Sequence, residues 1–213
     1  MQYDGILFDL DGTLWDATEA IAVSWELALQ DAPDVEAPPT REQLEQVMGM
    51  TAEDLMATLF PRLSPQRHQE LFARCCQVEN DYLRRHGGKL YPHMEETLRE
   101  LSQHLPLFIV SNCNADYIPC FLDAHKLHDC FQDWECIGRT GKPKGENIRL
   151  VAERNQVQRP VYVGDTALDQ EAACFAGVPF LHAAYGFGAI DREVPFVDQF
   201  SAIPAAVRRL SPP

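Results

Sequence analysis

The sequence lacks any long hydrophobic run, since none of its apolar stretches approaches the roughly 18 residues that cross a membrane. The N-terminal residues MQYDG also lack the basic and then apolar segments of a secretory signal peptide. Basic residues are scarce, with 18 lysines and arginines against 32 acidic residues and a formal net charge of −14. That balance disfavours proteins that bind nucleic acid or a membrane surface, which need a basic face. We therefore expect a cytoplasmic protein whose partner is neither nucleic acid nor membrane.

Disulfide-bonded and zinc-binding classes are also disfavoured. The seven cysteines are an odd number, two of them are adjacent, and no Cys-x-x-Cys pair occurs. Cysteines and histidines gather between residues 113 and 136, but their spacing does not match a zinc ribbon or finger. Reduced, mostly buried thiols are the simpler interpretation.

What the sequence does contain is a pattern of short apolar strands alternating with helices. At 213 residues and 46% hydrophobic content, the chain fits one domain or one domain with an insertion. Near-continuous apolar runs predict strands covered on both faces, and their alternation with helices predicts a parallel α/β sheet. The predicted strands are Gly5–Leu10, Leu107–Ser111, Trp134–Ile137, Val161–Gly164 and Phe180–Ala183. The predicted helices of this part are Met94–Gln103, Ala115–Ala124, Gly145–Arg154, Ala167–Ala176 and Ile203–Leu210.

The segment between the first two strands, from about Trp15 to Pro92, has no strand pattern. Nearly eighty residues are too many for a crossover loop, so we expect an inserted all-helical subdomain. Its predicted helices are Ala17–Asp31, Thr40–Met48, Ala52–Leu59 and Pro65–His86, and Thr40 with Gln43 fits a capping box. The expected organisation is an α/β core of residues 1–14 and 92–213, with a helical cap of residues 15–91.

Carboxylates follow two of the predicted strands. Asp9 and Asp11 end the first strand, Asp165 follows the fourth, and Asp169 lies one helical turn later. Because parallel strands bring their carboxyl ends to one edge of the sheet, these acids are expected to meet there, together with Ser111 at the end of the second strand. Clustered carboxylates repel one another and suit Mg²⁺, which prefers oxygen ligands. A carboxylate beside such an ion can attack a phosphoryl group.

Three segments resemble motifs of the haloacid dehalogenase superfamily. DLDGTLWD is similar to its first motif, FIVSN to its second, and YVGDTALDQEAACFAG to its fourth. LYPHMEETLREL is similar to the segment that re-enters the core from a helical cap. The resemblance covers nearly the whole chain and implies a Rossmann-like fold, a helical cap and the phosphoglycolate phosphatase-like branch.

The resemblance also implies roles for individual residues. Asp9 would be the nucleophile and a Mg²⁺ ligand, and Asp11 would act as acid and base while its backbone carbonyl contacts the metal. Asp165 and Asp169 would complete the metal site. Ser111 would hydrogen-bond the transferring phosphoryl group, with Asn112 and Thr13 as substrate-binding residues.

The third motif requires a lysine, and GRTGKPKGENI offers Lys142 and Lys144. Lys142 precedes a proline, as in the common version of the motif, whereas Lys144 lies just before a predicted helix. We favour Lys144 and keep Lys142 as the alternative.

The same resemblance narrows the reaction. An acid at Asp11 favours phosphate ester hydrolysis over dehalogenation, since a halide needs no protonation. The absence of lysine from Trp15 to Arg85 argues against phosphonate hydrolysis, which uses a Schiff-base lysine in the cap. We expect a Mg²⁺-dependent phosphatase that acts on a small phosphorylated metabolite. The alternatives are a sugar phosphomutase of the β-phosphoglucomutase type and a non-catalytic binding module; the sequence leaves monomer and dimer open.

Candidates to line the interface between cap and core are Trp15, the Met48-Gly49-Met50 segment and Arg62, although ordinary packing explains them as well. The loop AYGFG follows the last predicted strand and is therefore also expected near the site.

Overall fold

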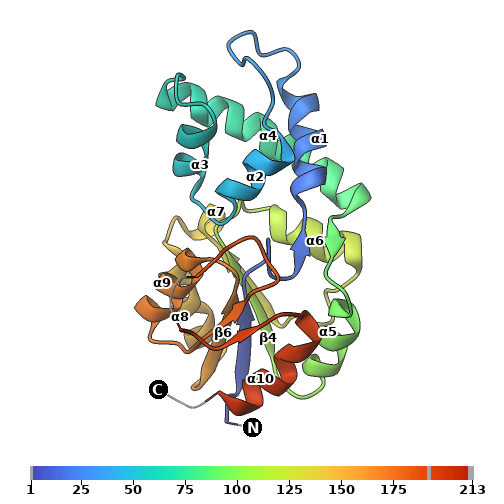
Figure 1. Ribbon diagram of the computed structural model, residues 1–213, viewed down its shortest axis with the longest axis vertical. Helices are drawn as coiled ribbons and strands as arrows, with labels where there is room; N and C mark the ends of the chain where they lie inside the picture. The colour runs from blue at the N-terminus through green and yellow to red at the C-terminus, as the bar shows by residue number, and fades with distance from the viewer. Residues whose placement is uncertain (1, 191–192, 211–213) are drawn as a thin grey trace.

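The computed structural model describes residues 2–190 and 193–210, and its centre is a six-stranded parallel sheet (Figure 1). The strand order is β5-β4-β1-β6-β7-β8, so the first strand of the chain lies between β4 and β6. The bounds are β1 (Gly5–Phe8), β4 (Leu107–Ser111), β5 (Asp133–Cys136), β6 (Pro160–Gly164), β7 (Phe180–Ala183) and β8 (Phe196–Val197). This order places the carboxyl ends of β1, β4 and β6 side by side.

Both faces of the sheet are buried, which explains the continuous apolar runs of its strands. Successive side chains of β1 point to opposite faces, so that Leu7 lies in one apolar cluster and Ile6 and Phe8 lie in the other. Two helices, α8 (Lys144–Arg154) and α9 (Ala167–Ala176), pack on the Leu7 side. The opposite face is covered by α5 (Met94–Ser102), α6 (Tyr117–His125) and α10 (Ile203–Arg209), the last preceded by the 3-10 turn η1 (Phe200–Ala202).

Four helices form a separate layer beyond the carboxyl edge of the sheet, at the top of Figure 1. They are α1 (Thr18–Leu29), α2 (Arg41–Val47), α3 (Ala52–Leu59) and α4 (Pro65–His86). Local signals define them: Thr40, Thr51 and Ser64 each cap a helix with a side-chain oxygen, and Pro65 opens α4. The Thr40–Gln43 capping box is confirmed.

A short antiparallel pair joins this helical layer to the sheet. The strands β2 (Trp15–Asp16) and β3 (Lys89–Leu90) pair at the two points where the chain passes between the layers. Their existence corrects the expectation of a strand-free segment from Trp15 to Pro92. Two residues per strand are too few for a periodic pattern, and the partners lie more than seventy positions apart. The division into 1–14, 15–91 and 92–213 stays a prediction.

Several predicted bounds also need correction. The first strand ends at Phe8 rather than Leu10, because the chain turns there: the N–H groups of Thr13 and Leu14 both donate to the carbonyl of Leu10. β5 and α6 lie one or two residues from their predicted bounds, and the short helix α7 (Ile137–Thr140) and strand β8 are additional elements. By contrast, α3, α4, α9, β4 and β7 have the predicted bounds.

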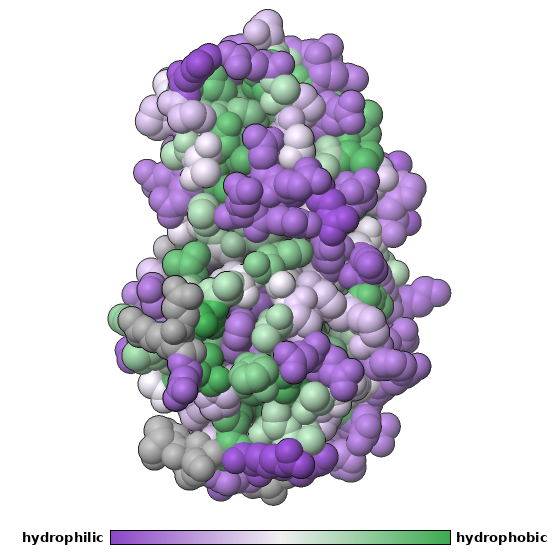
Figure 2. Space-filling view, viewed as in Figure 1, coloured by the Kyte–Doolittle hydropathy of each residue, from purple (hydrophilic) through white to green (hydrophobic). Residues whose placement is uncertain are grey.

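In the part of the chain that the structure describes, no helix combines the length and apolar character needed to cross a membrane. Hydrophilic side chains cover much of the face shown in Figure 2, and apolar side chains are visible between them in the helical layer at the top.

Candidate active site

Three neighbouring strands deliver polar side chains to one edge of the sheet. Asp9 follows β1, Ser111 is the last residue of β4, and Asp165 follows β6. The backbone N–H of Asp9 donates to the carbonyl of Val163 (2.8 Å), which holds the end of β1 beside the end of β6. The order of the strands therefore brings these residues to the same edge of the sheet, as expected.

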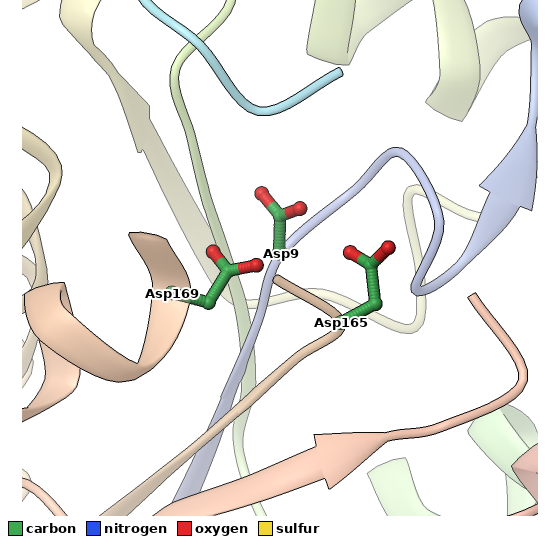
Figure 3. Close-up of side chains that lie close together, drawn as sticks. All are labelled: Asp9, Asp165 and Asp169. Carbon is green, nitrogen blue, oxygen red and sulfur yellow. The ribbon is translucent and has the colours of Figure 1, made fainter. Parts of the chain in front are cut away.

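Asp9, Asp165 and Asp169 form a compact buried group of carboxylates (Figure 3). One oxygen from each lies within 4.8 Å of the others, and each side chain is almost entirely buried. Burial and then the charge of Asp169 raise the pKa of Asp9 to about 6. Burial, followed by the charges of Asp169 and Asp9, holds the pKa of Asp165 well above its usual range. This mutual repulsion needs positive charge nearby.

Lys144 supplies one such charge. Its Nζ lies 2.8 Å from Asp9 Oδ1 and 2.7 Å from Asp169 Oδ1, and its side chain is 3% exposed. Burial alone would lower the pKa of Lys144, but the carboxylates of Asp169 and Asp9 raise it above its ordinary value. The ammonium is therefore charged and bridges the two acids.

Lys142, the alternative lysine, lies elsewhere. Its side chain is 51% exposed, and its Nζ approaches Glu146 at 3.9 Å on the surface. Pro143 is the N-cap of α8, and Lys144 is the first residue of that helix, which turns the Lys144 side chain inward. Two positions along the chain thus separate a surface lysine from a buried one.

The loop after β7 holds Asp165. Asp165 Oδ2 accepts hydrogen bonds from the backbone N–H groups of Phe187 (2.8 Å) and Gly188 (3.3 Å). The Thr13 hydroxyl donates to Asp165 Oδ1 at 3.4 Å. Gly186 has to be glycine, because a Cβ there would collide with the Gly12 carbonyl and the Asp165 side chain. The AYGFG loop therefore lies at the site, as expected.

Asp169 is held by its own helix. Thr166 and Asp169 form a capping box at the start of α9, in which Asp169 Oδ2 accepts from the N–H and the hydroxyl of Thr166. Its other oxygen accepts from Lys144 and from the Tyr162 hydroxyl (3.3 Å). Both oxygens have partners, so the orientation of this carboxylate is defined.

Asp11 has a different environment from the three buried carboxylates. Its Oδ1 accepts from the Tyr117 hydroxyl (2.8 Å) and from Trp15 Nε1 (2.9 Å). Burial and the charge of Asp9 raise its pKa to about 7, although both hydrogen bonds oppose that shift. Among the described residues, the group of carboxylates able to share an ion does not include the Asp11 side chain. An acid with a pKa near neutrality can both donate and accept a proton.

A pocket opens between this edge of the sheet and the helical layer. Asp9, Asp11, Ser111 and Asn112 line its floor, and the Met48-Gly49-Met50 segment lines it from the helical side. Asn112 Nδ2 donates to the carbonyl of Gly49 (3.0 Å), which connects the two layers directly.

Arg62 does not belong to this pocket, contrary to expectation. Its side chain is 83% exposed and pairs with Glu36, which lies in the Pro-rich loop between α1 and α2. The ion pair joins residues 26 positions apart, so the sequence does not reveal it. Trp15 is fully buried and acts on the site through its hydrogen bond to Asp11.

Two residues at the pocket were not foreseen from the sequence, Glu79 on α4 and Tyr117 on α6. Glu79 is 5% exposed and accepts a 2.6 Å hydrogen bond from Trp25 Nε1. A signal was available for Glu79, because it shares helical spacing with the buried residues Leu71, Cys75 and Leu83. An acidic residue in such a row of buried apolar positions indicates a carboxyl group that is itself buried.

The donor set fits Mg²⁺. Three buried carboxylates, Asp9, Asp165 and Asp169, face one ammonium, so with all of them ionised the group carries a surplus of negative charge. Their donor atoms are hard oxygens, which suit Mg²⁺ better than softer metals.

The chain is similar to known proteins over most of its length. The family described as haloacid dehalogenase-like hydrolase matches residues 6–183. A phosphoglycolate phosphatase from Vibrio vulnificus is 30% identical over 197 residues, covering 85% of this chain and 84% of that protein. The phosphoglycolate phosphatase of Vibrio cholerae is 32% identical over 200 residues with the same coverage. A haloacid dehalogenase-like family hydrolase from Streptococcus pneumoniae has the same fold, with a TM-score of 0.82, 21% identity and coverage of 97% of this chain and 99% of that one.

Proposed function

The chain belongs to the haloacid dehalogenase-like hydrolases and is a phosphatase, and we propose that it hydrolyses a small phosphorylated metabolite with Mg²⁺ through an aspartyl-phosphate on Asp9. One observation carries the proposal. Asp9, paired with Lys144 at 2.8 Å, shares a pocket with Asp11, whose pKa is raised to about 7. A nucleophile and a proton donor therefore face the same space.

In the first step, a carboxylate oxygen of Asp9 attacks phosphorus and the ester P–O bond breaks. The leaving oxygen takes the proton of Asp11, whose raised pKa keeps a substantial fraction protonated near neutral pH. Lys144 keeps positive charge beside the Asp9 carboxylate while the phosphoryl group transfers. The Ser111 hydroxyl and the backbone N–H of Asn112, on the pocket floor, would hydrogen-bond the phosphoryl oxygens. Thr13, expected to bind substrate, is fully buried and donates to Asp165, so it would support the site by holding that carboxylate.

In the second step, water attacks the phosphorus of the aspartyl-phosphate. Asp11, now ionised, accepts the proton from water, and the bond between phosphorus and Asp9 breaks to release inorganic phosphate. Asp9, Asp165 and Asp169, with the backbone carbonyl of Asp11, would hold Mg²⁺, which supplies charge neutralisation when bound.

The test is release of phosphate from p-nitrophenyl phosphate with and without Mg²⁺. We expect Mg²⁺-dependent release by the natural protein and a loss of about a thousandfold or more in Asp9→Asn. Asp31→Asn is the matched control, because Asp31 is a cap-layer aspartate whose side chain is 78% exposed. Circular dichroism would verify that both variants fold.

The products also separate the proposal from its nearest alternative. A phosphomutase would return the phosphoryl group to the sugar, so sugar phosphates would yield an isomer rather than free phosphate. Isomerisation without phosphate release, or equal release by Asp9→Asn, would contradict the proposed hydrolysis.

A further inference from the structure

The pocket beside Asp9 has an unusual balance of charge. Among the described residues that line it, the ionisable carboxylic acids are Asp9, Asp11 and Glu79, and none is lysine, arginine or histidine. Lys144 lies close by, but both its contacts are with Asp9 and Asp169. Outside the part of the pocket that would hold the phosphoryl group, a substrate therefore meets acidic side chains and no cation that balances their charge.

The cap cannot easily supply the missing cation. The segment from Trp15 to Arg85 contains six arginines and no lysine. Five of the arginines pair with carboxylates, and the sixth, Arg85, donates to the carbonyl of Asp81. A substrate with a second anionic group would have to place it in this pocket without a basic partner, which is costly away from water.

Two polar side chains of the pocket, Glu79 and Asn112, have oxygens that can accept hydrogen bonds. Glu79 lines the pocket, and its Oε2 accepts a hydrogen bond from Trp25 Nε1. Asn112 Oδ1 is buried and has no donor among the described residues, while its Nδ2 is engaged by Gly49. Such acceptors are satisfied by a ligand that brings donors.

The remaining wall of the pocket is apolar. Ile21, Leu44, Met48, Leu55 and Phe72 line it from the helical layer. These side chains suit a short carbon frame and give no hydrogen bonds. The side chain of Asn114 is hydrogen-bonded to Asn80, and the Tyr117 hydroxyl to Asp11, which leaves Glu79 and Asn112 to bind a polar substituent.

We propose that Glu79 is a specificity-determining residue of this phosphatase, and that its substrate has a leaving group with a hydroxyl or ammonium donor on a short carbon frame and no carboxylate. The proposal rests on the phosphatase function argued above. It separates this chain from the substrate named for its relatives, since phosphoglycolate carries a carboxylate and none of the described residues that line the pocket is a lysine, arginine or histidine.

The electrostatics of Glu79 agree with this assignment. Burial raises its pKa to about 8, the hydrogen bond from Trp25 opposes the shift, and the charge of Asp11 adds to it. Glu79 is thus mostly protonated near pH 7 without substrate, and its carboxyl group can both donate a hydrogen bond to a substrate hydroxyl and accept one from it. A substrate ammonium would instead favour its ionised form.

Three esters with one carbon frame make the test: 2-hydroxyethyl phosphate, 2-aminoethyl phosphate and phosphoglycolate. We expect the hydroxyl or the amino ester to have a kcat/KM at least about tenfold above that of phosphoglycolate. The better of the two identifies the donor. A preference for phosphoglycolate, or equal rates on all three, would overturn the proposal.

The variant Glu79→Gln keeps the size of the side chain and an acceptor for Trp25 but removes the acid. We expect it to reduce the preference for the donor-bearing ester over phosphoglycolate, measured as the ratio of their kcat/KM values, by about fivefold or more. Glu70→Gln is the matched control, since Glu70 lies on the same helix with its side chain 52% exposed. An unchanged ranking in Glu79→Gln would refute the role of Glu79.

Failure of the phosphatase function would look different. If the phosphatase function were wrong, Mg²⁺-dependent release of phosphate from p-nitrophenyl phosphate would be absent as well. If only the substrate proposal were wrong, that release would remain, and only the order of the kcat/KM values of the three esters would differ from expectation.

Discussion

The Tyr117 hydroxyl donates a 2.8 Å hydrogen bond to Oδ1 of Asp11, across 106 positions of the chain. Tyr117 opens α6 and is 3% exposed, so the contact is sheltered from water. Burial raises the pKa of Tyr117 well above its usual range, so its hydroxyl stays neutral and remains a donor. The bond favours the ionised form of Asp11 and thereby limits how far its pKa rises.

We predict that Tyr117→Phe shifts the pH dependence of phosphate ester hydrolysis. Without the hydroxyl, the pKa of Asp11 rises above about 7, so the proton donor stays protonated to higher pH. The descending limb of kcat/KM should move upward by roughly half to one pH unit. Tyr82→Phe is the control, because Tyr82 lies on α4 with its ring against that of His86, and it should leave the pH profile unchanged. A lower rate with an unmoved limb would mean that Tyr117 only supports packing.

Lys144→Ala and Lys142→Ala should have very different effects. Removing the ammonium of Lys144 leaves Asp9 and Asp169 facing each other without a cation, and we expect kcat/KM to fall about a hundredfold or more. Lys142 is exposed, and its loss should change kcat/KM by less than about threefold. Steady-state kinetics on purified variants with matching circular dichroism spectra would decide. The reverse pattern would assign the role to Lys142.

Gly186→Ala should weaken the site with little effect on the rest of the fold. The added Cβ would displace the Asp165 side chain or the Gly12 backbone, and we expect activity to fall about tenfold and the Mg²⁺ concentration for half-maximal rate to rise. Gly141→Ala is the control, because Gly141 has a φ of +67° but nothing within 4 Å of an added Cβ. That variant should lose about 1 kcal/mol of stability and keep its activity.

Glu79→Gln should reveal the buried acid through the pH dependence of stability. Folding raises the pKa of Glu79 from 4.5 to about 8, so between these values the folded protein binds a proton that the unfolded chain has released. The natural protein therefore loses stability on this account as pH rises, whereas the variant does not.

The free energy of unfolding of Glu79→Gln relative to the natural protein should consequently increase from pH 5 to pH 8, by up to about 1.4 kcal/mol per pH unit. Urea denaturation at several pH values would measure it. The same comparison for Glu70→Gln should be flat, since Glu70 is exposed. A constant difference for Glu79→Gln would show that this carboxyl ionises normally.

Helices α3 and α4 show how much of the fold is local. Their bounds could be predicted because Thr51 and Ser64 cap them, Pro65 opens α4, and the apolar residues follow helical spacing. The strands β4 and β7 could be predicted from continuous apolar runs. The two-residue strands β2, β3 and β8 could not, because each exists only through its pairing with a distant segment.

In the candidate site, too, some residues could be predicted from local patterns and others could not. Asp9, Asp11, Asp165 and Asp169 could be selected from the motifs around them and from the rule that parallel strands share a carboxyl edge. Arg62 was selected wrongly, and Glu79 and Tyr117 were not selected at all, since each depends on contacts made across the chain.

The alternation of strands and helices, the helical layer after the first strand and the carboxylates at the strand ends can all be read from the sequence alone. These features arise from neighbours a few positions apart, through side-chain periodicity, capping and proline geometry. The folded chain places the favoured Lys144, and not Lys142, against Asp9. The hydrogen bonds of Tyr117 and Trp15 to Asp11, and the position of Glu79 at the pocket, could be seen only in three dimensions. Those contacts depend on burial and charge supplied by remote segments, which no local pattern contains.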